Sequence, residues 1–396
     1  MITLTNRLER IEEPQTLLMA KKAKALKDQG IDLVDLSLGE PDFATPKYII
    51  EAANQAMLDG FTKYPPVAGI AALKNAIVEK LKRDNNLEYN PNQIVVSTGA
   101  RQSLANAIMS LVEEGDEVLI PTPYWVTYND LVQLAHAKSV FIPCGVEDKF
   151  KVNAEKLEAA ITNKTKLFVF SSPCNPSGAV YSREELERLV EVFKKYPNIY
   201  IISDEIYEYI NYVEKHESIA SFEEIKDRVI LINGFSKGFA MTGWRLGYMA
   251  AHPEIAAACE KFQGQITSGA NIIAQKAGVR ALSDLTEAKK MTEQFRKRRD
   301  YFVNALRNIE GIKLDMPDGA FYAFPDISYY FGKATASFKI NNANDFTDYL
   351  LNIAHVTGVS GSAFGLDNCI RFSFAASIEE LEIAINRIKN ALEDLK

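Results

Sequence analysis

Residues 229–250 read VILINGFSKGFAMTGWRLGYMA, and this stretch decides the fold class. It holds two short apolar runs, Val229–Asn233 and Leu246–Ala250, with a glycine-containing loop between them. Short apolar runs bounded by turn residues are typical of buried strands, so we expect these runs to belong to one central sheet. Five similar runs precede them along the chain: Ile94–Ser97, Glu117–Ile120, Ser139–Pro143, Leu167–Ser171 and Tyr200–Ser203.

Helical patterns alternate with these strands, at Arg101–Val112, Ser182–Lys195 and Glu254–Phe262. This alternation predicts an α/β fold, in which helices cover both faces of a mostly parallel sheet. Ligands bind such sheets at the carboxyl ends of the strands. The candidates for chemistry follow strands in this way: Gly99, Asn175, Asp204 and the pair Ser236 and Lys237.

The chain has 396 residues, which is too long for one ordinary core, so we expect two domains. We predict an N-terminal arm with part of a small domain over residues 1–45, a large domain over 46–290 and a small α+β domain over 291–396. A charged helix from Thr286 to about Asn308 is interpreted as a solvated bridge between domains, with a basic patch as the alternative. The small domain should contain Phe321–Pro325, Asn344–Ile353, Ile370–Phe374, a helix from Ser377 and the N-terminal helix Gln15–Gly30.

The composition excludes several classes of function. Apolar residues make up 47% of the chain and the net charge is −7, so we expect a folded protein that does not bind nucleic acid. The four cysteines are far apart and the four histidines have no ligand spacing, which predicts a reducing compartment and no metal site. No stretch is apolar for long enough to cross a bilayer, and residues 1–7 lack a signal-peptide core, so we predict a cytoplasmic location without a membrane partner.

The loop around Lys237 carries the first chemical signal. A lone lysine is usually a surface charge, but this one follows Ser236, lies among glycines and precedes Arg245 by eight positions. A reactive amine beside an anion site is what Schiff-base chemistry on a phosphorylated cofactor needs. The turn from Ser97 to Arg101 ends a strand and starts a helix, whose free N–H groups attract phosphate, although ordinary βα turns look similar.

Further polar side chains follow strongly apolar segments. Asp204 could pair with a protonated ring nitrogen, with Tyr207 on the same face of a helical turn; the alternative is a helix cap. Asn175 lies in a turn-forming stretch, and its amide could donate to a phenolate. Trp125 could stack on a flat ring or simply pack in the core. Arg371 lies within an apolar strand, where it needs either a buried acid or a substrate carboxylate.

With these motifs in hand, the chain resembles the class I and II aminotransferases of fold type I, which use pyridoxal phosphate, and among them the bacterial Ib branch of aspartate aminotransferases. The resemblance rests on LSLGEPDF at 36–43, NPSG at 175–178, DEIY at 204–207, SKGFAMTGWRLG at 236–247 and RFS at 371–373, which occur in the family's order. It implies a large domain with a mostly parallel seven-stranded sheet and a smaller α+β domain. Ser177 and Ser360 depart from the family, where threonine and proline are usual.

The resemblance also implies roles for single residues. Lys237 would form the Schiff base with pyridoxal phosphate and carry the proton, Asp204 would hold the ring nitrogen, and Tyr207 and Asn175 would bind the ring's 3-oxygen. Trp125 would stack on the ring. The phosphate region would be formed by Ala100, Arg101, Ser236 and Arg245, with Tyr64 reaching in from a partner subunit, which implies a homodimer.

Substrate binding is implied in the same way. Arg371 would clamp the α-carboxylate, and the Gly39 backbone would close over it. Arg101 and Thr16 would read a dicarboxylic side chain, so we predict transfer from L-aspartate to 2-oxoglutarate, giving oxaloacetate and L-glutamate. The alternatives are an aminotransferase for aromatic, prephenate or branched substrates, and a C–S lyase that shares the lysine and the cofactor. The effector domain of a pyridoxal-dependent regulator is disfavoured by the acidic charge and by the absence of a preceding DNA-binding module.

Overall fold

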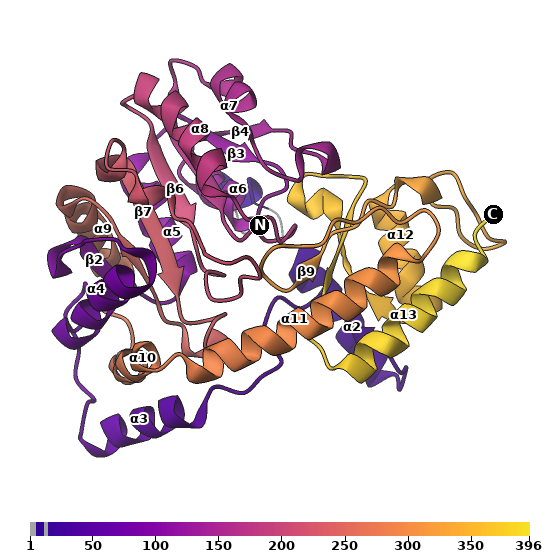
Figure 1. The fold of residues 1–396 in the computed structure, drawn as a ribbon, viewed down its shortest axis with the longest axis horizontal. Coiled ribbons are helices and arrows are strands. Elements are labelled where there is room, and N and C mark those ends of the chain that lie inside the picture. Colours follow the sequence, from indigo (N-terminus) through magenta and orange to yellow (C-terminus); the bar gives the residue numbers. More distant parts are fainter. Residues whose placement is uncertain (1–4, 12–14) are drawn as a thin grey trace.

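The computed structural model describes residues 5–11 and 15–396, and its centre is a seven-stranded sheet in the order β2-β8-β7-β6-β5-β3-β4 (Figure 1). All neighbouring pairs are parallel except the two that involve β8, which runs antiparallel to β2 and to β7. The predicted mostly parallel sheet is therefore confirmed. Its strands are β2 Ile94–Ser97, β3 Glu117–Pro121, β4 Lys138–Ile142, β5 Thr165–Ser171, β6 Tyr200–Asp204, β7 Val229–Gly234 and β8 Gly247–Ala250.

Helices bury both faces of the sheet. Successive side chains of a strand point to opposite faces, so each strand contributes to two cores. In β5, Leu167 and Val169 enter one apolar core, whereas Phe168 and Phe170 enter the other. The first core is closed by α5 Ala100–Leu111, α6 Thr127–Leu134 and α9 Pro253–Ile266. The second is closed by α4 Ala71–Asn85, α7 Ala154–Ala160, α8 Arg183–Lys195 and α10 Ile272–Ser283, and α3 Lys47–Leu58 packs on α10.

The smaller part of the molecule is built from both ends of the chain (Figure 1). It has a parallel pair, β1 with β10, and an antiparallel sheet in the order β11-β12-β9. Met19 and Ala23 of α2 pack on Leu33 and Leu351, as expected for the N-terminal helix. The domain limits at residues 45 and 290 stay a prediction. The elements here are α2 Gln15–Asp28, β1 Val34–Asp35, β9 Tyr322–Ala323, α12 Ala343–Tyr349, β10 Val356–Thr357, β11 Val359–Ser360, β12 Ile370–Ser373 and α13 Ile378–Glu393.

The long charged helix is α11, Thr286–Arg307, and it runs from the large sheet towards α13 (Figure 1). Phe295 and Phe302 on one side of it are buried. Most of the cations on its other sides have partners; Arg298, for example, donates to Asp42 with both terminal nitrogens, at 2.6 and 2.9 Å. This matches a solvated bridging helix and not a free basic patch.

The four cysteines are all buried and unpaired. Within residues 5–11 and 15–396, no helix is long and apolar enough to cross a membrane. A short helix, α1 Asn6–Glu9, contacts α6 at the start of the described chain.

Candidate active site

A cavity of about 580 Å³ opens at the carboxyl ends of the parallel strands and is lined by residues of both parts of the molecule. Tyr64, in contrast, is 95% exposed and does not line the cavity of its own chain. The side chain of Thr16 lies outside the described residues, and only its place in α2 is known. Eleven of the predicted site residues line the cavity: Gly39, Ala100, Arg101, Trp125, Asn175, Asp204, Tyr207, Ser236, Lys237, Arg245 and Arg371.

Lys237 lies in the turn that follows β7, and its Nζ donates to the carbonyl oxygen of Gly39. Burial lowers the pKa of Lys237 to about 8, and the positive charges of Arg371 and Arg245 act in the same direction. A lysine with such a pKa carries a sizeable neutral fraction near neutral pH, as a nucleophile or proton acceptor requires.

Asp204 ends β6 and is only 3% exposed. Burial raises its pKa to about 6, although its carboxylate accepts hydrogen bonds from the Tyr128 hydroxyl at 2.8 Å and the Ile206 amide at 3.2 Å. The acid therefore both caps the following turn and faces the cavity, so the two interpretations of this residue are compatible. Tyr128 was not predicted as a site residue, although it lies one helical turn after Trp125 and packs edge-on against it.

Tyr207 lies in the turns after β6, and its hydroxyl is 2.6 Å from that of Tyr322. Tyr322 is a second residue of the cavity that the sequence did not reveal, because only its strand was expected. A Cβ on Gly39 would come within 2.9 Å of the Tyr322 hydroxyl oxygen. Glycine at position 39 thus lets the backbone approach the site, and this brings the Gly39 carbonyl to Lys237.

Arg371 is on β12 and is 2% exposed. It donates to the carbonyl oxygen of Ser37 at 2.7 Å and to Oδ1 of Asn175 at 2.9 Å, while its Nε has no hydrogen-bond partner within the described residues. Its guanidinium lies over the ring of Tyr322. The buried acid that was the alternative partner is not found among residues 5–11 and 15–396. A buried cation of this kind favours binding of an anion from outside the chain.

A second place for an anion lies where α5 begins. Gly99, with φ of 82°, precedes the helix, and the first amides of the helix, at Ala100 and Arg101, have no backbone acceptor among the described residues. A Cβ on Gly99 would lie 2.5 Å from Nη2 of Arg245, so only glycine allows this arginine to lie against the turn. Arg101 lies over the Trp125 ring at 4.9 Å, and burial lowers its pKa, with Arg245 adding to the effect.

In this α/β fold the cavity holds a lysine of lowered pKa, Lys237, together with the buried Arg371 and with Arg245 at the start of α5. The family model of class I and II aminotransferases matches residues 31–388, and the chain belongs to this family. It is 45% identical over 403 residues to the bifunctional aspartate aminotransferase and glutamate/aspartate-prephenate aminotransferase of Petunia hybrida, covering 100% of this chain and 84% of the relative.

Other relatives match this chain over 98% to 100% of its length. The aspartate/prephenate aminotransferase of Nitrosomonas europaea is 44% identical, over 98% of this chain and 99% of the relative. The crystal structure of the aspartate aminotransferase from Rhizobium meliloti superposes with a TM-score of 0.97 at 41% identity, covering both chains fully. The aspartate aminotransferase from Thermus thermophilus with maleate gives a TM-score of 0.92 at 36% identity, covering 99% of this chain and 100% of that one.

Proposed function

We propose that this aminotransferase uses pyridoxal phosphate to move the amino group of L-aspartate to 2-oxoglutarate, giving oxaloacetate and L-glutamate. One observation carries the proposal. Lys237, an amine with a lowered pKa, lines the same cavity as Arg371, a buried guanidinium without a carboxylate partner among the described residues. The names of the relatives, aspartate aminotransferase and aspartate/prephenate aminotransferase, support this substrate class.

The residues around the cavity fit the proposed cofactor. Lys237 would hold its aldehyde carbon, Asp204 would hold its ring nitrogen, and Trp125 would cover one face of the ring. Ser236 and Arg245, with the first amides of α5, would hold the phosphate. When bound, pyridoxal phosphate supplies an electron-withdrawing ring that stabilises negative charge at the substrate Cα.

The chain itself then supplies binding and proton transfer. Arg371 binds the α-carboxylate through its planar guanidinium, which Asn175 orients from one side and the Ser37 carbonyl from the other. Asp204 is mostly ionised at pH values above its pKa of about 6. Its carboxylate then favours a cation opposite it. Lys237, once its amine is free, takes the proton from Cα as a general base and returns it as a general acid, which suits a pKa of about 8.

The direct test is an assay with the purified protein, pyridoxal phosphate, L-aspartate and 2-oxoglutarate. Oxaloacetate is measured by coupling to malate dehydrogenase, and a panel of other amino donors is measured in parallel. We expect aspartate to be used best. Pyruvate release from cysteine conjugates without amino transfer to any 2-oxo acid would contradict the proposal and support a C–S lyase. Prephenate is assayed as a second acceptor, because two of the relatives carry it in their names.

The dicarboxylic preference is assigned to Arg101, which lines the cavity and lies over the ring of Trp125. Maleate, a dicarboxylate, is part of the printed description of the Thermus thermophilus structure, which supports this assignment. Arg101→Ala should weaken aspartate turnover by about 2–5 kcal/mol of transition-state binding, while aromatic or neutral amino acids lose far less. Equal losses in kcat/KM for all donors would contradict a role in reading the side chain.

We also propose a homodimer in which Tyr64 completes the cavity of the other subunit. Support comes from the surface around it: Met57, Leu58 and Phe61 near the end of α3 are exposed together with Tyr64. Apolar residues that are exposed together in this way mark a protein interface. The exposed Ile266 belongs to the same region, since a Cβ on the nearby Gly269 would contact Pro65 and Pro66.

A further inference from the structure

The turn after β6 has two faces with different surroundings. Asp204 and Tyr207 line the cavity. Glu205 and Glu208, which alternate with them in the sequence, are 1% and 6% exposed and do not line the cavity. Buried carboxylates are costly unless they are paired, so these two glutamates need an explanation that the proposed reaction does not give.

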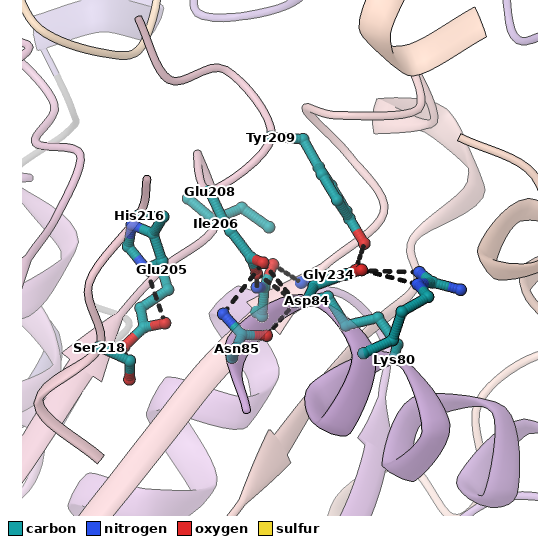
Figure 2. Close-up of polar contacts among 12 residues, drawn as sticks. Lys80, Asp84, Asn85, Glu205, Ile206, Glu208, Tyr209, His216, Ser218 and Gly234 are labelled. Carbon is teal, nitrogen blue, oxygen red and sulfur yellow. Dashed lines mark hydrogen bonds and ion pairs between the residues drawn. The ribbon is translucent and has the colours of Figure 1, made fainter. Parts of the chain in front are cut away.

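Glu208 is held by donors from three other segments. Lys80 of α4 donates to both carboxylate oxygens, Asn85 at the end of α4 donates to Oε1 at 3.1 Å, and Asn233 of β7 donates to Oε2 at 2.6 Å. Lys80 is itself fully buried and gives its remaining bond to Asn85 at 2.7 Å. Figure 2 labels Lys80, Asn85 and Glu208 and shows the contacts made by this carboxylate as dashed lines. Every polar atom of the Lys80 and Glu208 side chains thus has a partner.

This cluster joins the segments that carry two of the proposed site residues. Glu208 follows Tyr207 directly, and Asn233 precedes Lys237 by four residues on the strand that leads to it. Oδ1 of Asn233 also accepts from the Gly234 amide at 2.7 Å, which fixes the end of β7.

A second contact lies next to the first. The ring of Tyr209 lies so close to Gly238, the residue after Lys237, that a Cβ there would be 2.8 Å from it. The hydroxyl of Tyr209 donates to Asp84 at 2.7 Å (Figure 2). The turn and the lysine loop are therefore connected both by the Glu208 carboxylate and by the packing of Tyr209.

We propose that Glu208, paired with Lys80, is a positioning residue that sets Tyr207 and Lys237 at the right separation for the reaction. The catalytic importance of the separation between Tyr207 and Lys237 rests on the proposed function. The contacts of Glu208 and Tyr209 that join the two segments belong to the fold and do not depend on it. Arg371 lies on β12 and is oriented by Ser37 and Asn175, none of which contacts Glu208. Loss of the Glu208 connection should therefore lower kcat much more than it changes KM.

Two substitutions break the connection in different ways. Glu208→Gln leaves one acceptor oxygen for Lys80, Asn85 and Asn233, which are all donors. Asn233→Ala keeps the ion pair with Lys80 and removes the bond from β7 to Glu208, together with the bond that Asn233 accepts from the Gly234 amide. The matched control is Glu117→Gln. Glu117 is 7% exposed and bonds to Lys138 and Thr162, but it begins β3 at the amino end of the strands, away from the cavity.

Activity is one readout. We expect Glu208→Gln to lower kcat by about 10- to 100-fold, since small misplacements of reacting groups have effects of this size, and to change KM by less than about threefold. Asn233→Ala should lower kcat in the same direction by a smaller factor. Glu117→Gln should match the wild-type.

The second readout needs neither cofactor nor turnover. The apoprotein is pulse-labelled with an amine-reactive reagent over a range of pH, and Lys237 modification is measured by peptide mass spectrometry relative to the exposed Lys47. We expect the wild-type midpoint near pH 8 and a shift to higher pH in both cluster variants, because a displaced amine is better hydrated. If Glu208→Gln only removed the negative charge and left the Lys237 amine in place, the labelling midpoint would shift to lower pH.

The outcomes separate the two proposals. A wild-type enzyme that transfers no amino group overturns the proposed function, while the labelling comparison still tests the positioning role. A folded Glu208→Gln protein with unchanged kcat and an unchanged or lowered labelling midpoint overturns the positioning role. If Glu208→Gln does not fold, Asn233→Ala decides in the same way: unchanged kcat and labelling overturn the role, and a loss of kcat with a raised midpoint supports it.

Discussion

The pKa values of Lys237 and Asp204 are both shifted towards the neutral form of the side chain. Burial lowers the pKa of Lys237 and raises that of Asp204, so each charge destabilises the apoprotein. Titratable groups that weaken the fold while they line a cavity are typical of active sites. Stability measurements on the apoprotein can therefore test the site without any substrate.

Lys237→Met should stabilise the apoprotein. The folded pKa of about 8 lies below the ordinary 10.5, so the unfolded chain binds more protons between these values and stability rises with pH across that window. Below the window the full penalty, at most about 3 kcal/mol, is present, and the methionine variant avoids it. Urea unfolding at neutral pH should show the gain, and the gain should shrink above pH 8. A variant less stable than the wild-type at neutral pH would contradict this account.

Asp204 should make the apoprotein less stable as the pH rises. Its folded pKa of about 6 exceeds the ordinary 3.8, so its contribution is full below the lower value and is lost as the pH passes the higher one. The difference in unfolding free energy between wild-type and Asp204→Asn should fall over this window and then stay flat. Since the Tyr128 hydroxyl lowers the pKa of Asp204, Tyr128→Phe should extend the fall to higher pH. An identical profile in Tyr128→Phe would show that the hydrogen bond has no influence.

At the scale of residues, the sequence predicted the groups that occur in motifs and missed the groups that touch them from elsewhere. Lys237, Asp204 and Arg371 follow strands or lie in them, so their place at one edge of the sheet could be expected. Tyr128 and Tyr322 reach the same cavity from a helix and from the small domain. No spacing in the sequence relates Tyr322 to Tyr207, because the contact exists only once the two parts of the molecule are packed together.

The start of α5 combines a backbone requirement with an anion site. Gly99→Ala places a side chain where φ is 82° and pushes the Arg245 guanidinium away from the helix start. We expect it to lose about 1 kcal/mol of stability and to bind inorganic phosphate more weakly, as measured by calorimetry on the apoprotein. Gly115→Ala is the control, since φ there is 98° and nothing lies within 4 Å of the new Cβ. Equal phosphate affinity in the two variants would refute the role of Gly99.

Helices and strands were predicted well where the apolar pattern of a segment and the turn residues at its ends indicate the same limits. The seven strands of the large sheet lie where the apolar runs predicted, within two residues at each end, because buried strands and turn residues leave clear marks. The helix expected over Asn344–Ile353 differs: α12 ends at Tyr349, and residues Leu350–Ala354 form a wider π-type turn. The apolar pattern continues through both segments, and it cannot distinguish i+4 from i+5 hydrogen bonds.

At the scale of the whole molecule, the proposed homodimer with a shared site can be tested by mixing two inactive variants. Tyr64→Ala and Lys237→Ala should each be nearly inactive alone. When the two variants are unfolded, mixed and refolded together, half of the dimers should be mixed, and each mixed dimer should hold one intact site. Activity should then recover to about a quarter of the wild-type value. No recovery in mixtures shown to contain mixed dimers would mean that Tyr64 does not act in the partner's cavity.

The sequence could not show how the two ends of the chain come together. The pairing of β1 with β10 joins residues near the N-terminus with residues more than 300 positions later, at Val34 and Val356. The extent of each domain and the assembly with a second subunit stay predictions, because both depend on surfaces that leave no periodic signal. Composition and alternation, in contrast, were enough for the fold class, since they record which segments are buried on both sides.

The order of strands in the large sheet has a consequence for the newly made chain. β2 lies at the edge and has one neighbour in the strand order, β8, which begins 150 residues after β2 ends, at Gly247 after Ser97. At ordinary rates of synthesis, the ribosome takes about 8 to 30 seconds to add that length. Throughout that interval the apolar residues Ile94 to Val96 have no strand to pair with, so the nascent chain should engage chaperones most strongly before Ala250 emerges.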